Sequence, residues 1–227
     1  HRPVSALNWA FGGTVHTVAR AGRVAFVGGR FNAVASRYNV TGGFAVVSPA
    51  TSQRALRAVR VHGNVNAIVP DGSGGWFVGG NFTFVGEHRQ PQIAHILASG
   101  RLDTAWTGRV NGRVASLALV GATLYVGGEF TAAGSGGGAA MAAARQNLAA
   151  FSTADGALLA DASTGADGVV TALAATGTTL YAGGDFATFL GQSRARLAAY
   201  DTQTNSVTAW NPSADAAVRA IVPAAGG

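Results

Sequence analysis

The sequence of 227 residues contains no cysteine and no lysine, and only 11% of its residues are charged. The absence of cysteine excludes a disulfide framework, a thiolate zinc site and a cysteine nucleophile. The low charge leaves few side chains for ionic chemistry and, together with 48% apolar residues, favours a packed β-fold over a disordered chain. No run of about 18 apolar residues is present, so we expect no membrane-spanning segment.

All 16 basic residues are arginines, and they are distributed unevenly. Residues 1–113 contain 12 Arg and three acidic residues, a net charge of +9, whereas residues 114–227 have a net charge of −3. A basic half could attract an acidic glycan, a nucleic acid or an anionic surface. Because no run of basic residues is interleaved with aromatic residues, we do not expect nucleic acid as a partner, and we interpret the arginines as scattered on solvated strand edges.

Glycine is abundant, with 33 residues, and eight of these glycines recur as pairs within one short pattern. The stretch "AFVGGRFN" returns as "WFVGGNFT", "LYVGGEFT" and "LYAGGDFA", with glycine pairs 51, 48 and 56 residues apart. The pairs are Gly28 and Gly29, Gly79 and Gly80, Gly127 and Gly128, and Gly183 and Gly184. A variable residue follows each pair (Arg30, Asn81, Glu129 and Asp185), and a phenylalanine comes next (Phe31, Phe82, Phe130 and Phe186).

Each glycine pair belongs to a longer unit of four short runs rich in Val and aromatic residues, bounded by turn residues. Such runs are typical of β-strands, and four strands per unit at a period near 50 predict an all-β chain, a β-propeller of four-stranded antiparallel blades. The repeat units span residues 15–64, 65–113, 114–168 and 169–217.

The two ends of the sequence carry partial copies of the unit. Residues 1–14 resemble a fourth strand that contains Trp9, and "VRAIV" from Val218 resembles a first strand within the partial copy 218–227. We therefore expect about four complete blades with partial blade strands at both ends, forming one domain or an arc of a larger ring. We expect the unfinished sheet edge to pair with another chain or with a missing part of the same chain.

The pattern of the last full unit, "VTALAATGTTLYAGGDFATFLGQSRARLAAYDTQT" (Val170 to Thr204), resembles the bacterial delta-60 repeat, and it is also similar to kelch repeats. The resemblance covers the chain from about Val15 to Ile221, with departures in the first and third units. It implies a β-propeller scaffold that is secreted or exposed on the cell surface. It implies no shared reaction, because a fold alone does not supply one.

The recurrence of the glycine pair decides how its third copy should be interpreted. Gly127, Gly128, Glu129 and Phe130 resemble part of the GGDEF signature of diguanylate cyclases. Because the glycines recur in every unit while the residue after them varies, we interpret the pairs as architecture that allows positive φ and close backbone approach, with the flanking aromatics packing between blades.

The variable position opens a loop, and we expect any ligand contacts there, at Arg30, Asn81, Glu129 and Asp185. The expected function is a non-catalytic extracellular or cell-envelope scaffold that binds protein or carbohydrate. One alternative is a polysaccharide hydrolase or lyase in which Glu129 and Asp185 act as acid and base, or jointly hold a cation or a sugar hydroxyl. A second alternative is a structural subunit of a larger assembly.

Other side chains are considered for chemistry and interpreted as structural. No other copy of the unit supplies a third metal ligand beside His88 and His95, and no catalytic triad signature occurs, so we expect no metal, cofactor or catalytic residue. One Arg precedes each third strand and is expected to brace a loop, with an anion-binding ring as the alternative: Arg37, Arg89, Arg145 and Arg194. Trp9, Trp106 and Trp210 are expected in the core, and Asn39 and Asn81 lie in glycosylation sequons.

Overall fold

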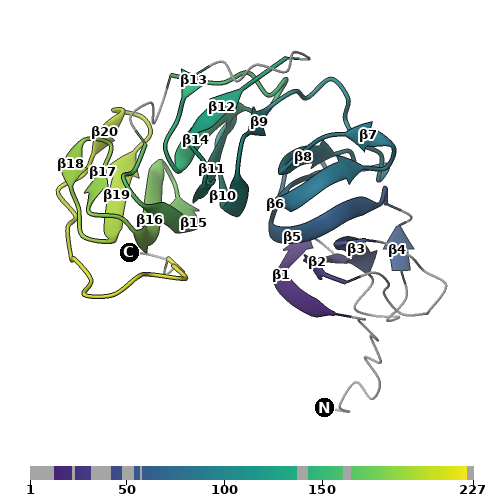
Figure 1. The fold of residues 1–227 in the computed structure, drawn as a ribbon, viewed down its shortest axis with the longest axis horizontal. Coiled ribbons are helices and arrows are strands. Elements are labelled where there is room, and N and C mark those ends of the chain that lie inside the picture. Colours follow the sequence, from purple (N-terminus) through teal and green to yellow (C-terminus); the bar gives the residue numbers. More distant parts are fainter. Residues whose placement is uncertain are drawn as a thin grey trace, which may run out of the picture. The chain divides into compact units, whose positions relative to one another are not determined.

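The computed structural model describes residues 13–21, 24–31, 42–47, 54–56, 58–136, 143–160 and 165–223, and these residues form antiparallel strands (Figure 1). Within these ranges there is no helix, and so none that is long and apolar enough to cross a membrane. The prediction of an all-β chain with antiparallel sheets is confirmed. The chain divides into two compact units, residues 1–103 and 104–227, and the boundary falls inside the predicted repeat 65–113.

The first compact unit contains two four-stranded sheets that correspond to the first two repeats (Figure 1). One sheet has the order β1 (Thr14–Ala21), β2 (Val24–Arg30), β3 (Phe44–Val47) and β4 (Arg54–Leu56). In the other sheet β6 (Trp76–Val85) pairs with β5 (Val61–Pro70), β7 (His88–Arg89) and β8 (Ile93–Ile96).

The second compact unit contains the sheets of the third and fourth repeats. The main sheet of the third repeat consists of β10 (Arg113–Val120), β11 (Thr123–Glu129) and β14 (Leu148–Ser152). A separate small sheet consists of β13 (Ala143–Ala144), β12 (Ala132–Gly134) and β9 (Arg109–Val110). The fourth repeat has β15 (Val169–Thr176), β16 (Thr179–Asp185), β19 (Leu197–Asp201) and β20 (Ser206–Val207), and a hairpin of β17 (Thr188–Phe189) and β18 (Gln192–Ser193).

The second glycine of each pair is required inside its own sheet. The first strand of every repeat has a β-bulge one residue after a valine, and the second glycine lies opposite that valine. A methyl group added at this glycine would lie 2.0–2.1 Å from a first-strand carbonyl oxygen in all four repeats. Since backbone cannot move away as a flexible side chain can, only glycine fits there. The predicted close backbone approach is therefore confirmed.

The first glycine of the first, third and fourth pairs faces the segment that follows its own repeat. A methyl group added at Gly28 would lie 2.7 Å from Val65 Cγ1, and one at Gly127 would lie 2.7 Å from Val170 Cγ1. None of the eight paired glycines is among the positive-φ residues of the described chain. The prediction of positive φ at the pairs is wrong, because the pairs lie within extended strands and the tight turns use other glycines, such as Gly121 and Gly177.

The aromatic residues around the glycine pairs join neighbouring sheets within each compact unit. The rings of Phe26 and Trp76 are 4.4 Å apart, and those of Tyr125 and Tyr200 are 6.3 Å apart in an edge-to-face arrangement. The four phenylalanines that follow the variable residues are all buried, at Phe31, Phe82, Phe130 and Phe186. The predicted packing of aromatics between successive repeats is confirmed for these pairs.

The fourth strand of the repeat is shorter than its sequence pattern predicts. In the second repeat it is reduced to a single bridge between Ile96 and Leu102, and in the third to one between Phe151 and Leu158. The predicted strand in residues 1–14 lies almost wholly outside the described residues. The run from Val218 is described but does not form a strand there.

Candidate functional site

The four variable residues occupy one equivalent position of the repeat: Arg30, Glu129 and Asp185 are the last residues of their strands, and Asn81 lies within the longer strand β6. Each side chain is exposed, whereas the glycines before it and the phenylalanine after it are buried. The variable residue and the phenylalanine after it are adjacent in the chain and therefore point to opposite faces. The structure thus places all four predicted binding residues, Arg30, Asn81, Glu129 and Asp185, on the surface.

Glu129 and Asp185 are solvated carboxylates, each paired with a different arginine. Arg113 Nη2 lies 3.5 Å from Glu129 Oε2, and Arg196 Nε lies 3.4 Å from Asp185 Oδ1. The two acidic side chains remain 65% and 66% exposed. Such pairs contribute little to stability. Both carboxylates therefore face solvent rather than a dry cleft.

A polar pocket of about 350 Å³ lies beside Arg30, between the first two sheets of the first compact unit. Arg30 and Phe31 come from the end of β2, and the first half of β5 supplies the facing wall. The lining residues are Gly13, Arg30, Phe31, Gly42, Gly43, Arg60, Val61, His62, Gly63 and Asn64. Of the four variable residues, Arg30 is the one that lines this pocket.

Glycine backbone forms part of the pocket wall, because the chain segments approach too closely for larger residues. A methyl group at Gly43 would lie 2.2 Å from the carbonyl oxygen of Gly63, and one at Gly42 would lie 2.0 Å from that of Val61. The Gly43 N–H donates to the Val61 carbonyl at 3.0 Å, and the Gly43 carbonyl accepts from Gly29 at 2.9 Å. The wall is therefore fixed by backbone hydrogen bonds, with the longer polar side chains around it.

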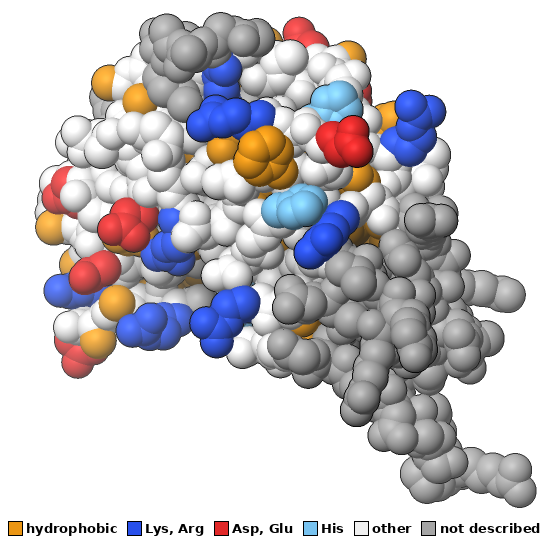
Figure 2. Space-filling view, turned by 45° about the vertical axis from the view of Figure 1, so that its right-hand side comes forward, with side chains coloured by type: hydrophobic (Ala, Val, Ile, Leu, Met, Phe, Trp, Pro, Cys, Tyr) orange, Lys and Arg blue, Asp and Glu red, His pale blue; other side chains and the backbone are white. Residues whose placement is uncertain are grey.

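The charge of the pocket is positive. Arg30, Arg60 and His62 are exposed side chains, and no acidic residue lines the cavity. Within the described part of the chain neither guanidinium forms an ion pair with a carboxylate. Two planar donors that are not neutralised by the protein suit carboxylate or sulfate groups of a ligand. Figure 2 shows basic side chains spread over the face in view, with acidic and uncharged side chains among them.

A second polar cluster, around His95, is buried. Nδ1 of His95 lies 2.9 Å from Asp103 Oδ2 and Nε2 lies 3.0 Å from Asp71 Oδ2, while the ring stacks on Phe77 at 4.4 Å. Each ring nitrogen of His95 therefore lies within hydrogen-bond distance of a carboxylate oxygen. The cluster joins the turn after β5 to the segment after β8, a role for which its burial and full pairing are suited.

The carboxyl group of Asp71 is held ionised by its hydrogen bonds. Burial by itself raises the pKa of Asp71, but bonds from the Ser73 hydroxyl, His95 and the N–H groups of Ser73 and Gly75 outweigh burial, and the pKa lies below its usual value. Sequence reasoning considered His95 with His88 and missed both aspartates. In the described residues no group of three or more His, Asp or Glu side chains is arranged to hold a metal ion.

The recurrent arginines act as braces where they are described. Arg145 donates to the carbonyl oxygens of Ala144 at 2.8 Å and Leu159 at 3.2 Å, and Arg194 donates to those of Ser193 at 2.7 Å and Thr208 at 2.8 Å. The brace prediction is confirmed for these two, with backbone carbonyls as the acceptors. Arg89 lies exposed in β7, and Arg37 falls outside the described residues.

The predictions for the tryptophans and the glycosylation sequons have different outcomes at different residues. Trp106 is buried, with its ring 6.0 Å from that of Phe151, and its indole N–H donates to the Ser152 carbonyl. The core prediction is thus confirmed for Trp106 but wrong for Trp210, which is exposed on one side and contacts Tyr181 edge-on. Trp9 and Asn39 lie outside the described residues, and Asn81 is exposed.

One recurrent glycine was missed by the sequence reasoning. It stands two residues before the first-strand valine in each full repeat, at Gly13, Gly63, Gly112 and Gly168. A methyl group there would lie 1.8–2.5 Å from the carbonyl oxygen of the variable residue in the same repeat. The signal was visible as a third glycine at constant spacing from the valine.

Comparison with known proteins supports the fold and gives no function. No family model matches the sequence, and no curated protein matches it. The chain is similar to the crystal structure of the computationally designed Ika8 protein, with a TM-score of 0.59 and 14% sequence identity over 93% of this chain. At that identity the likeness concerns the fold alone. The chain spans about half, 53%, of the designed chain's length.

Proposed function

We propose that this chain is a non-catalytic β-propeller scaffold of the extracellular space or cell envelope, and that it binds acidic carbohydrate through the pocket at Arg30. The single observation that carries the binding proposal is the convergence of Arg30, Arg60 and His62 on one cavity without a lining carboxylate. A protein ligand with acidic side chains is the second ligand class that such a pocket suits.

The repeat geometry supports the propeller part of the proposal. In each compact unit, one sheet packs on the next through the first glycine of the pair and the first strand of the following repeat. Blades of a propeller pack face to face in this way. The prearranged strands present the variable residue without a loss of backbone freedom on binding, which favours affinity.

The ligand class follows from the donors in the pocket. Guanidinium groups bind carboxylate and sulfate groups with two parallel hydrogen bonds, and Asn64 adds amide groups for sugar hydroxyls. A polysaccharide of uronic acids supplies both kinds of partner. The hydrolase alternative has no comparable observation in its favour, because Glu129 and Asp185 are exposed and each is paired with a different arginine.

The test is calorimetric titration of the protein with polygalacturonate oligomers. The double variant Arg30→Ala/Arg60→Ala is expected to weaken binding at least about tenfold, since each lost charged hydrogen bond is worth about 1–3 kcal/mol. Arg89→Ala/Arg101→Ala is the matched control, because it removes the same two positive charges at exposed sites outside the pocket. Equal weakening by Arg89→Ala/Arg101→Ala, or no binding by the unaltered protein, would refute the proposed pocket.

A further inference from the structure

The strand pair beside the pocket is longer than its counterparts in the third and fourth repeats. β5 and β6 have ten residues each, whereas the corresponding strands there have seven or eight. In those repeats Asn111 and Asp167 accept hydrogen bonds from the two backbone N–H groups that follow the motif phenylalanine, at 2.9–3.0 Å. His62 occupies this position in the second repeat, and the two strands continue to pair past it as far as Val61 and Val85.

A β-bulge near the end of this strand pair turns Phe84 to the surface. Phe82 and Phe84 pair with the consecutive residues Gly63 and His62, so Thr83 is an extra residue on β6. One extra residue reverses the alternation of faces along a strand. Phe82 is therefore 1% exposed and Phe84 is 41% exposed, although without the bulge both would share the buried face.

The fold does not require an aromatic residue at position 84. The residue two places after the motif phenylalanine is small or polar in the other repeats, where it is Ala33, Ala132 and Thr188. The second repeat alone has an aromatic residue at this position. Its two departures from the pattern, His62 and Phe84, lie directly opposite each other on β5 and β6.

Phe84 lies beside the wall of the pocket. Directly opposed residues of an antiparallel pair share a face, and the rings of His62 and Phe84 are 6.5 Å apart in an edge-to-face arrangement. The exposed Asn81 pairs in the same way with Asn64. His62 and Asn64 line the pocket. Because neighbouring strands are about 4.8 Å apart, Phe84 and Asn81 stand one strand beyond the pocket wall.

We propose that Phe84 and Asn81 form a second sugar subsite, which binds the sugar unit that emerges from the pocket. The Phe84 ring stacks on the apolar face of that sugar, and the Asn81 amide forms hydrogen bonds with its hydroxyl groups. The ligand is therefore an acidic oligosaccharide rather than a single uronic acid. This inference rests on the proposed carbohydrate pocket and extends it.

The other cross-strand neighbour of Phe84 lies outside this path. Phe84 pairs on its far side with Arg89 of β7. Because β6 lies between β5 and β7, Arg89 is on the side of Phe84 away from the pocket. The oligosaccharide crosses β5 and ends on β6, so the second subsite recognises its sugar by an aromatic ring and an amide.

The test compares galacturonic acid with its linear trimer by calorimetric titration of the full chain. The trimer should bind the unaltered chain at least about tenfold more tightly than the monomer, because only the trimer reaches Phe84. Phe84→Ala should weaken trimer binding about five- to tenfold, the effect of one stacked ring, and should change monomer binding less than about twofold. Phe84→Tyr keeps the ring and should retain the trimer affinity within about twofold.

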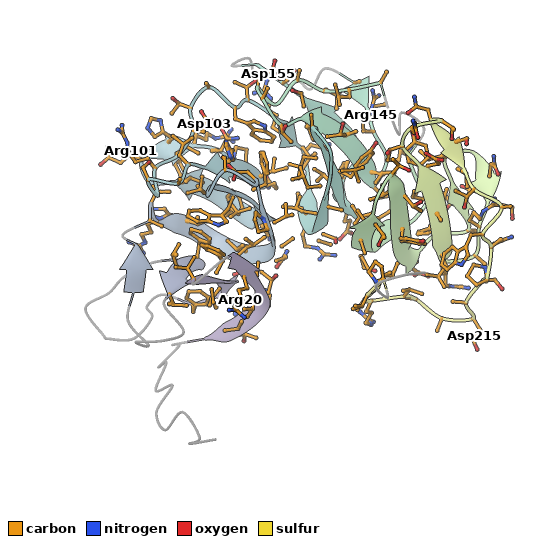
Figure 3. All side chains as sticks on the ribbon, turned by 180° about the vertical axis from the view of Figure 1, so that it is seen from behind. Arg20, Arg101, Asp103, Arg145, Asp155 and Asp215 are labelled. Carbon is orange, nitrogen blue, oxygen red and sulfur yellow. The ribbon has the colours of Figure 1, made fainter. Side chains whose placement is uncertain are left out.

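Leu97→Ala is the matched control, because Leu97 is also a partly exposed apolar residue, at 38%, and does not line the pocket. It follows Ile96, which pairs with Trp76 at the opposite end of β6 from Phe84. The Leu97 N–H donates to the carbonyl of Arg101, whose side chain points away from the strands (Figure 3). This variant should leave the binding of both sugars unchanged.

The outcomes separate the second subsite from the pocket itself. If neither sugar binds the unaltered chain, both the pocket and the second subsite are refuted. If both sugars bind and Phe84→Ala weakens neither, or weakens both equally, the pocket stands and the second subsite is refuted. Equal weakening of trimer binding by Leu97→Ala would also overturn the assignment to Phe84.

Discussion

Gly183 packs against Val218, and a methyl group added to the glycine would lie 2.6 Å from Val218 Cγ1. The same relationship joins Gly127 to Val170 and Gly28 to Val65. In each case the first glycine of a pair contacts a valine of the segment that follows its repeat, while the second glycine contacts a backbone carbonyl of its own sheet. The two glycines are therefore required for different reasons, and substitutions can distinguish them.

Gly127→Ala and Gly128→Ala should differ in whether a second substitution can rescue them. Both should lower the free energy of unfolding by about 1–3 kcal/mol through overpacking. The methyl group at 127 meets side-chain atoms of Val170, so Val170→Ala should recover part of the loss in the double variant. The methyl group at 128 meets the Arg113 carbonyl oxygen at 2.1 Å, so the same second substitution should not help. Denaturant titration of the four variants measures this, and equal rescue of both glycines would contradict the assignment.

Asp71→Asn should destabilise the first compact unit in a pH-dependent way. The pKa of Asp71 is lower in the folded chain than its ordinary value of 3.8, so the ionised carboxylate stabilises the fold above that pH and the stabilisation is lost as the pH falls through the folded-state pKa. At pH 7 the variant should lose about 1–3 kcal/mol, because His95 then loses a charged acceptor. Thermal unfolding at pH 7 and at about pH 3 should show a difference that shrinks in acid. A difference that is constant with pH would show that charge is not involved.

Arg194→Ala should loosen the outer edge of the fourth repeat. The guanidinium donates to the Thr208 carbonyl, and the Thr208 N–H donates to the Ala199 carbonyl at 2.8 Å. Without the brace, hydrogen exchange at the Thr208 amide should accelerate about tenfold. Arg194→Lys should behave like the alanine variant, because one ammonium group does not reach both carbonyls. Unchanged exchange in both variants would show that the brace carries no stability.

The sequence predicted the repeated parts of the fold well, because recurrence separates constant residues from variable ones. The glycine pairs, the buried phenylalanines and the exposed variable position were all indicated by comparing four copies. Of the two structural roles predicted for the glycine pairs, close backbone approach and positive φ, only the first is present. Close approach is present, but positive φ occurs in the hairpin turns at residues such as Gly121 and Gly177, since the pairs remain in extended strands.

The candidate site was less predictable, because it depends on residues that do not recur. Arg30 was indicated by its place in the motif, whereas Arg60 and His62 belong to the approach to the next repeat and meet it only through folding. The His95 cluster likewise unites residue 71 of a turn, residue 95 of strand β8 and residue 103 of a connecting segment. Pairwise contacts of this kind leave no periodic signal in a single sequence.

The most direct test of the binding proposal compares Arg30→Glu with Glu129→Arg, because the two residues occupy the same position in different repeats. Affinity for polygalacturonate oligomers is measured by calorimetry for both variants and the unaltered chain. The account predicts that Arg30→Glu reduces affinity at least about tenfold, since it places a carboxylate in the ligand's site, and that Glu129→Arg changes it less than about twofold. If affinity instead follows net charge, falling in the first variant and rising equally in the second, binding is not located in the pocket and the central claim is contradicted.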